Sequence, residues 1–304
     1  GMAFDFMLVI LSGYIAMSIA DRPGLVVGFV GGAISKAGTT FTSLGNPEEV
    51  LVSSGFLGAL LAGFIGGYVV LFLKKLFSFM PKSLEGIRTI LIYPVAGVLL
   101  IGLIMLLINP FVSAINTGLN NFLSSMSEVN KVILGAILAG MMSVDLGGPV
   151  NKAAYTFGTG MLAEGHYEIM AAVMIGGMVA PLAIALLATF FPKKLPKKER
   201  QAGLLNYVMG LSFISEGAIP FASADPLRVL VSCVIGSAVS GALSMAFNCT
   251  LMAPHGGIFV LPLIGNWAWY VVALAAGSFV AMGIMALWKK NVWESESENI
   301  NAKG

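Results

Sequence analysis

The sequence has few charged residues: Asp, Glu, Lys and Arg together make up 11% of its 304 positions. Soluble globular domains carry roughly a quarter of such residues. Here 57% of the positions are apolar, and the mean hydropathy is +0.90. This composition excludes a soluble enzyme, a secreted disulfide-rich scaffold and a disordered adaptor. We therefore expect a chain that lies in a lipid bilayer.

Motifs for nucleotide hydrolysis and for metal binding are missing as well. The sequence has no Walker A motif, no glycine-rich dinucleotide motif and no cluster of His and Cys. Its two cysteines, Cys233 and Cys249, stand in apolar stretches without metal-ligand spacing, and we interpret them as packing residues. We expect no cofactor, no metal ion and no nucleic-acid partner, and we exclude primary pumping by this chain alone.

The apolar residues form long continuous runs, which are typical of transmembrane helices rather than of short alternating strands. The runs that are long enough to span are Gly55–Leu73, Thr89–Ile108, Ile169–Phe191, Val229–Pro254 and Trp267–Trp288. A further apolar segment, Phe4–Ala20, precedes them, whereas Val26–Ala33 is too short to span unaided. The sequence therefore predicts an all-α polytopic membrane protein.

Basic residues gather in three places, at positions 74–88, 193–200 and 289–290. By the positive-inside rule all three face the cytoplasm. Since the helix from Thr89 leaves the cytoplasm and the helix ending at Phe191 returns, the segment between them must begin and end outside. The segment Gln201–Asp225 must likewise enter and leave on the cytoplasmic side. The apolar piece of the first segment, Val132–Val144, is too short to span comfortably, so a hairpin or a broken helix pair is expected, and the same logic applies to the second segment.

Two interruptions in these segments resemble one another. Asp145–Pro149 and Glu216–Pro220 each contain an acid, three mostly small residues and a proline. Paired short segments with glycine or proline breaks indicate a transporter's binding site, because unwound backbone is tolerated at membrane depth only where it lines a cavity or protein. We therefore expect two broken or re-entrant segments around a central site.

The polar residues near these breaks each have a structural alternative. Glu216 is a costly carboxylate at membrane depth unless it serves a site, but it could also be a helix-end group at headgroup level. Asp145 and Lys152 form either a simple intramembrane ion pair or part of a site. The Asn151 amide either contacts a sugar or satisfies local backbone. His255, before the Gly256-Gly257 break, is either a packing residue or a titratable site group.

Four stretches of sequence closely resemble one family of membrane proteins, in order and over nearly the whole chain. They are Ser12–Gly24, Met141–Tyr155, Phe213–Arg228 and Ala253–Gly257. The family is the fructose-type enzyme IIC component of the bacterial phosphoenolpyruvate-dependent phosphotransferase system. Its membrane domain usually has further helices before the Gly-Tyr-Ile-Ala stretch, so the resemblance predicts that this chain is N-terminally incomplete or unusually short.

The resemblance implies a function. Such a IIC domain binds a sugar, usually fructose, from outside, and a partner IIB domain phosphorylates the sugar from a phosphocysteine. IIA, HPr and enzyme I act upstream, so the chain is not catalytic alone. The resemblance also implies a homodimer in the bacterial inner membrane, in which a substrate-carrying part shifts against a scaffold. Residues 1–290 would form the membrane domain and residues 291–304 a polar cytoplasmic tail.

It also implies roles for particular residues. Glu216 would contact the sugar near the hydroxyl that is phosphorylated, and His255 would be a hydrogen-bond partner or a second acid–base group. The opposite wall would consist of Asp145, Asn151 and Lys152. The remaining predicted substrate-binding positions are the glycines of the breaks, Gly147, Gly148 and Gly256.

Two functions of other classes remain open on the residues alone. A proton-coupled secondary transporter would use Glu216 or Asp145 as its protonated carboxylate and would release unmodified solute. A catalytically silent membrane receptor would bind solute without passing it on. The phosphotransferase and the proton-coupled mechanism differ in whether phosphate reaches the solute.

Overall fold

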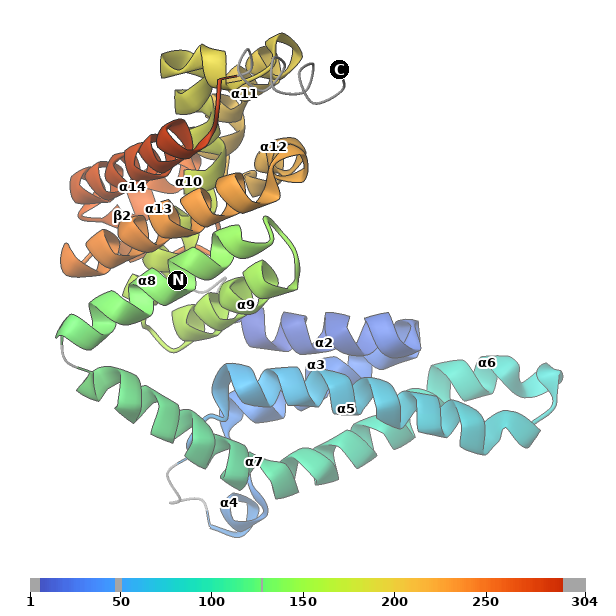
Figure 1. Ribbon diagram of the computed structural model, residues 1–304. Helices are drawn as coiled ribbons and strands as arrows, with labels where there is room; N and C mark the ends of the chain where they lie inside the picture. Colours follow the sequence, from blue (N-terminus) through green and yellow to red (C-terminus); the bar gives the residue numbers. More distant parts are fainter. Residues whose placement is uncertain (1–5, 47–50, 127, 292–304) are drawn as a thin grey trace. The chain divides into compact units, whose positions relative to one another are not determined.

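The computed structural model describes residues 6–46, 51–126 and 128–291. Its helices form two compact units, an N-terminal unit that ends at Ser125 and a C-terminal unit that begins at Met126 (Figure 1). Strand within the described residues is confined to one two-stranded sheet in the C-terminal unit. The all-α architecture that the sequence predicts is therefore confirmed.

The N-terminal unit is built on three helices that pack side by side, α2, α3 and α5, with α7 against α3 and α5 (Figure 1). Its elements are α2 (Met7–Ala20), α3 (Arg22–Ala37), α4 (Phe41–Gly45), α5 (Gly55–Leu76), η1 (Phe77–Phe79), η2 (Lys82–Leu84), α6 (Glu85–Ile87), the π-helical segment η3 (Arg88–Ile92) and α7 (Tyr93–Ser125). Small residues allow the close packing of α2 and α3. The Ser12 hydroxyl donates to the Gly28 carbonyl at 2.8 Å, where a Cβ on Gly28 would collide with the Ser12 backbone.

A buried polar network ties the end of α3 to α7. The Asn109 side chain accepts a hydrogen bond from the Ser54 hydroxyl at 2.9 Å and donates to the carbonyls of Ile34 at 3.1 Å and Thr39 at 2.8 Å. Asn109 is fully buried, so an unpaired amide there would be costly. The amide oxygen and nitrogen both have partners, which makes this network a structural feature of the N-terminal unit.

The other helices of the C-terminal unit pack around one buried helix, α10. Its elements are α8 (Glu128–Val144), α9 (Pro149–Ala163), α10 (Tyr167–Phe190), η4 (Pro192–Lys194), α11 (Lys197–Leu211), η5 (Ser215–Ala218), α12 (Ile219–Ala224), α13 (Pro226–Ala246), β1 (Thr250–Leu251), η6 (Ile258–Leu263), β2 (Ile264–Gly265) and α14 (Trp267–Trp288). The strands β1 and β2 pair antiparallel, with Thr250 opposite Gly265. Helices α8, α9, α11, α13 and α14 all contact α10, whose most apolar stretch is 94% buried.

Small residues and hydroxyl groups bring α8 and α13 onto α10. A Cβ at Gly176 would lie 2.5 Å from the Ala139 carbonyl oxygen. The Ser237 hydroxyl donates to the Gly176 carbonyl at 2.9 Å and lies 2.7 Å from the Ser143 hydroxyl. Interhelical contacts of small residues and serines are the usual means of helix association in a membrane. These contacts hold α10 against α8 and α13.

Five helical segments in the described residues are long and apolar enough to cross a membrane. They are Gly55–Phe79, Glu85–Ser125, Tyr167–Phe190, Pro226–Ala246 and Trp267–Trp288. They overlap the five runs that the sequence predicts, although the second helical segment continues from the predicted Ile108 to Ser125, and the chain is a polytopic membrane protein. The fourth predicted span, Val229–Pro254, is too long, since its helix ends at Ala246. Asn248 then adopts a left-handed backbone and β1 follows, although no charge marks this change in the sequence.

Two of the three basic regions lie at one end of the C-terminal unit. Lys194, just after α10, donates from Nζ to the carbonyl of Lys289, just after α14, at 2.5 Å. The ends of these two helices are therefore adjacent, as the same-side placement of the basic residues requires. The polar tail predicted for residues 291–304 lies, apart from its first residue, outside the described residues.

Candidate functional site

The first break, residues 145–148, separates α8 from α9. Leu146 and Gly147 both have positive φ values, 48° and 107°, so the backbone reverses there without helical hydrogen bonds. Asp145 stabilises the start of α9: its carboxylate accepts the backbone N–H of Val150 at 2.7 Å and that of Asn151 at 3.0 Å. These two donors are among those that a helix N-terminus leaves free. Asp145 is therefore a helix cap.

The simple ion pair between Asp145 and Lys152 is not formed. No salt bridge joins these two described residues, and the Lys152 side chain is exposed. The physical reason is proximity, because the N–H groups of α9 lie nearer to Asp145 along the chain than the lysine ammonium. Asn151, 6% exposed, donates from Nδ2 to the Met142 carbonyl at 2.6 Å. It satisfies a carbonyl at the end of α8, so the Asn151 amide nitrogen serves the backbone.

The second break lies between α11 and α12. Phe213 has a φ of 62°, and the short 3-10 helix η5 (Ser215–Ala218) carries Glu216. In contrast to Asp145, Glu216 is exposed, and within the described residues its carboxylate has neither an ion-pair nor a hydrogen-bond partner. The acid of the second break is therefore available to a ligand.

The third irregular segment, residues 253–257, follows β1. His255 is exposed, and its Nδ1 forms a short hydrogen bond with the Gly256 carbonyl. Since a carbonyl can only accept, Nδ1 donates, and Nε2 of the neutral ring keeps its lone pair. The segment is held from α9, because the Tyr155 hydroxyl donates to the Pro254 carbonyl at 2.8 Å.

These three segments meet in the C-terminal unit. A Cβ at Gly147 would lie 2.8 Å from Glu216 Oε1, so the first break touches the acid of the second. The rings of Phe213 and His255 have centroids 5.6 Å apart, inclined at 57°. A Cβ at Gly256 would overlap the Phe213 ring. Glycine is thus required where the second break approaches each of the other two.

Of the predicted site residues, the structure brings Gly147 against Glu216, and it brings His255 and Gly256 to the second break through the Phe213 ring. Gly148 packs against the Asp145 carboxylate, where an added Cβ would lie 2.6 Å from Oδ2. Asp145 and Asn151 hold the backbone of the first break, as their hydrogen bonds show. Lys152 is exposed on α9, and no contact with the other predicted site residues places it in the cluster.

Sequence reasoning missed three side chains at this site. Phe213 packs on His255 and also faces α10, where a Cβ at Gly177 would lie 2.6 Å from its ring. Tyr155 anchors the third segment. Asn206, on α11, is 2% exposed, and its amide oxygen lies against Gly217 without a hydrogen-bond partner in the described part of the chain. Tyr155 stands four residues after Asn151 and shares its helix face, which is the one available signal.

An ion-pair cluster follows the second break, just before α13. The Asp225 carboxylate contacts Lys289 Nζ at 3.1 Å and Arg228 Nη1 at 3.3 Å. Burial by itself would raise the pKa of Asp225, but the hydrogen bonds and charges of Lys289 and Arg228 outweigh it and bring the pKa below its ordinary value. The cluster joins the end of α12 to the end of α14.

Comparison with known proteins gives one consistent family. A family model described as "Phosphotransferase system, EIIC" matches residues 1–237. The chain is 47% identical to the fructose permease IIC component of Bacillus amyloliquefaciens over 96% of this chain and 91% of that protein. It is 45% identical to the fructose-specific EIIABC component of Bacillus subtilis, again over 96% of its own length. It is 46% identical to the fructose-specific EIIB'BC component of Escherichia coli over 92% of its length.

The lengths of these relatives differ. The chain spans 44% of the Bacillus subtilis protein and 48% of the Escherichia coli protein, so it covers less than half of each of these longer relatives. No solved structure matches the chain.

Proposed function

The chain belongs to the EIIC family of the phosphotransferase system, and we propose that it binds fructose and passes it across the bacterial inner membrane while a IIB phosphocysteine phosphorylates it. The single observation that carries this beyond the family is the meeting of Gly147, Glu216 and His255 at three backbone breaks. Unwound backbone beside an unpaired carboxylate offers a polyhydroxylated solute both donors and acceptors.

Glu216 is the proposed base. Its carboxylate has no protein partner in the described residues, so it can accept a sugar hydroxyl. As that hydroxyl oxygen attacks the phosphorus of the phosphocysteine, the new O–P bond forms and the S–P bond breaks. The cysteine thiolate leaves, and Glu216 takes the hydroxyl proton. The two cysteines of this chain are free and buried, so the phosphocysteine is proposed to come from a separate IIB domain.

His255 is proposed to accept a second sugar hydroxyl through Nε2. Because Nδ1 is committed to the Gly256 carbonyl and the ring packs on Phe213, the imidazole has a fixed orientation. A fixed acceptor at the same break as a free carboxylate would distinguish sugars by the placement of their hydroxyl groups.

The first break is proposed as the opposite wall of the site. Gly147 and Gly148 would present backbone groups to the sugar, while Asp145 and Asn151 position that backbone through the hydrogen bonds described above. Lys152 is proposed to reach the site from the exposed face of α9 when sugar is bound. Gly256 would contribute by allowing the Phe213 ring to stand against His255.

Further parts of the proposal concern orientation and assembly. We place residues 1–290 in the membrane domain and residues 291–304 in a cytoplasmic tail, with the C-terminus and the three basic regions in the cytoplasm. IIA, HPr and enzyme I would supply the phosphate to IIB. The names of the Bacillus subtilis and Escherichia coli relatives support the IIB partnership, since each includes a B component. A homodimer is proposed as the working assembly.

The test is uptake of radiolabelled fructose into proteoliposomes that contain the full chain and enclose a phosphorylated IIB domain of the Bacillus subtilis relative. We expect fructose phosphate inside only when phosphorylated IIB is present, and none with Glu216→Gln. Glu128→Gln is the matched control, because Glu128 is an exposed acid on α8 that pairs only with Lys131.

Other results would overturn the proposal. Free fructose that accumulates without IIB and is lost with an uncoupler would indicate a proton-coupled transporter. Saturable fructose binding without any internal sugar, in either chemical form, would indicate a receptor.

A further inference from the structure

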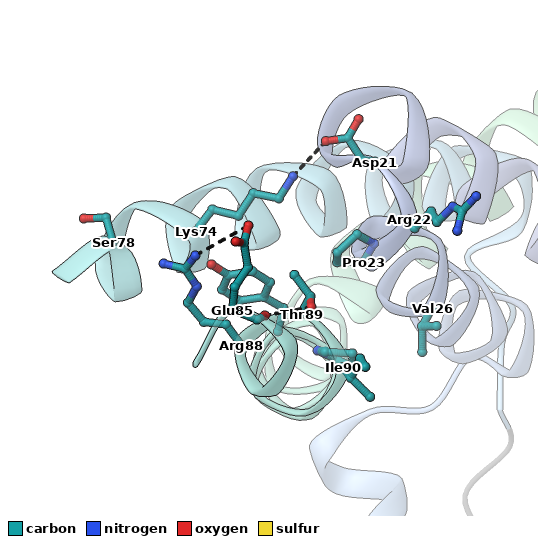
Figure 2. Close-up of a pocket in the computed structure, with 12 residues that line it drawn as sticks. Asp21, Arg22, Pro23, Val26, Lys74, Ser78, Glu85, Arg88, Thr89 and Ile90 are labelled. Carbon is teal, nitrogen blue, oxygen red and sulfur yellow. Dashed lines mark hydrogen bonds and ion pairs between the residues drawn. The ribbon is translucent and has the colours of Figure 1, made fainter. Parts of the chain in front are cut away.

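A charged cavity lies in the N-terminal unit, and the proposed function assigns no role to the residues that line it. Its volume is about 930 Å³, and it is bounded by the start of α3, the end of α5 and the segment from Glu85 to Pro94. Figure 2 shows that Lys74 reaches toward Asp21 and that Arg88 turns toward Glu85. The size is that of a small-molecule pocket.

Two cations of this cavity, Lys74 and Arg88, are only partly committed to protein partners. Lys74 Nζ contacts Asp21 at 2.8 Å, but the Asp21 side chain is 86% exposed, so this pair is open to exchange. Arg88 donates from Nη1 to the Phe77 carbonyl at 3.2 Å, and its nearest approach to Glu85 is a loose 3.9 Å. A third cation, Arg22, lines the cavity but points away from both (Figure 2).

The Arg88 guanidinium has a donor without an acceptor. Its Nε is buried and has no hydrogen-bond partner among the described residues, and the whole side chain is 15% exposed. An unpaired buried donor on a charged group is costly. An anion that entered the cavity would supply the missing acceptor and would also meet the Lys74 ammonium. The positive end of α3, whose first residues line the same cavity, adds to this attraction.

Apart from Ser78 and Thr89, the rest of the lining is apolar or aromatic. Val26 and Pro94 line the cavity together with Ile90, which is 81% exposed on the outer face of the unit. The charged part is therefore continuous with an exposed apolar side chain. Arginine prefers phosphate because its planar fork matches two phosphate oxygens. Basic pockets between membrane helices on the cytoplasmic side are suited to anionic lipid headgroups.

We propose that this cavity binds the phosphate group of an anionic phospholipid, held by Lys74 and Arg88, with its acyl chains against Val26 and Ile90. The Asp21 and Glu85 carboxylates release Lys74 and Arg88 when the phosphate enters. Because Asp21 bridges α2 to α5 through Lys74, binding exchanges a protein ion pair for a lipid contact at this corner of the N-terminal unit. None of the lining residues belongs to the proposed sugar site.

The experiment titrates the detergent-solubilised full chain with dioleoyl phosphatidylglycerol or dioleoyl phosphatidylcholine and counts bound lipid by native mass spectrometry. We expect phosphatidylglycerol to be retained and phosphatidylcholine to be lost. Lys74→Gln and Arg88→Gln should each weaken phosphatidylglycerol retention by about tenfold or more, since each removes a charge-assisted contact. Lys75→Gln is the matched control: it deletes the same charge one residue away, on a side chain that does not line the cavity.

A second arm separates the sources of phosphate. Glycerol 3-phosphate is offered to the same variants, and its binding is followed by the shift in melting temperature, which also reports whether each variant is folded. If lipid retention depends on Lys74 and Arg88 and glycerol 3-phosphate does not compete, the lipid is the ligand. The proposal would be overturned if glycerol 3-phosphate bound through Lys74 and Arg88 while phosphatidylglycerol was not retained. Equal effects of Lys74→Gln and Lys75→Gln on retention would also overturn it.

Discussion

The two breaks of the C-terminal unit have the same pattern of residues and use their acids in opposite ways. In the first break, Asp145 gives both carboxylate oxygens to the N–H groups of Val150 and Asn151. In the second, Glu216 lies in a 3-10 turn and has no protein partner among the described residues. One acid is used to hold the backbone, and the other remains free for a ligand.

The difference comes from where the next helix starts. Proline is the first residue of α9, and the N–H groups after it point back to the side chain that stands before the break. In the second break, Glu216 is already inside η5, and α12 begins only at Ile219. From its position inside η5, the Glu216 carboxylate makes no hydrogen bond to the N–H groups of the described residues at the start of α12. The position of the acid relative to the first residue of the next helix therefore decides whether its carboxylate caps that helix or stays free for a ligand.

The largest expected effect separates the two acids by function. Glu216→Gln should reduce formation of fructose phosphate by about 10²–10⁴-fold, the usual contribution of a positioned acid or base. Asp145→Asn should leave it within a few-fold of wild type, because its amide oxygen still accepts one of the two N–H groups and Asp145 is proposed to position backbone rather than to take a proton. The measurement is the initial rate in proteoliposomes with phosphorylated IIB. Similar losses in both variants would remove the functional distinction between the breaks.

The sequence predicts the breaks but not their contact. Uncharged runs identify the five spans, and an acid, small residues and a proline identify Asp145–Pro149 and Glu216–Pro220. The approach of Gly147 to Glu216 depends on how α8 and α11 pack on α10, which no local pattern records. The left-handed backbone of Phe213 cannot be predicted from the sequence either, since residues other than glycine rarely adopt it.

The hydrogen-bond partners of the polar residues cannot be predicted from the local sequence either. Opposite charges near one another favour an ion pair, so Asp145 and Lys152 are a natural interpretation of the sequence. The free N–H groups of a helix start compete for the same carboxylate, and which wins depends on backbone direction at Leu146 and Gly147. The alternative for Asn151, that its amide satisfies local backbone, agrees with its hydrogen bond to Met142. Whether Asn151 also contacts sugar stays a prediction.

The contact between the breaks can be tested by a single methyl group. In Gly147→Ala the new Cβ would press on the Glu216 carboxylate, and the φ of 107° adds strain of roughly 1–3 kcal/mol. We expect uptake to fall by roughly ten- to a hundredfold, since displacing a reacting group by about 1 Å can cost that much in rate.

Gly165→Ala is the matched control for this strain. Gly165 also has a positive φ, of 90°, but a Cβ there would meet nothing within 4 Å. Both variants should lower the melting temperature, and only Gly147→Ala should abolish most of the uptake. Equal loss of uptake in the two variants would show that strain alone, and not contact with Glu216, is responsible.

Removing the cap should affect stability more than chemistry. Asp145→Ala deletes the acceptor of two N–H groups at the start of α9, and we expect a loss of about 1 kcal/mol in stability. Asp145→Asn should recover only part of it, because its amide has one accepting oxygen for the two N–H groups. The measurement is thermal unfolding in detergent, with Glu216→Gln as the comparison, which should melt close to wild type. If Glu216→Gln is instead the less stable variant, the roles of the two acids are reversed.

A third acid of the C-terminal unit extends the comparison to a smaller effect. Asp225 is paired with Lys289 and Arg228 rather than with backbone or ligand, and it is largely but not fully buried. Such a pair contributes roughly 1 kcal/mol, so Asp225→Asn should lower the melting temperature slightly and leave uptake unchanged.

The pH dependence of this contribution has a definite sign. Because the pKa of Asp225 is lowered in the folded state from its ordinary 3.8, the stabilisation is present above that ordinary value and is lost as the pH falls through the lower, folded value. The difference in melting temperature between wild type and Asp225→Asn should therefore be constant from pH 7 to about pH 5 and shrink only in stronger acid. A double-variant cycle with Lys289→Gln isolates the pair. A coupling that instead grew on acidification would mean that Asp225 is protonated in the folded chain. The contact between α12 and α14 would then not depend on a charged Asp225.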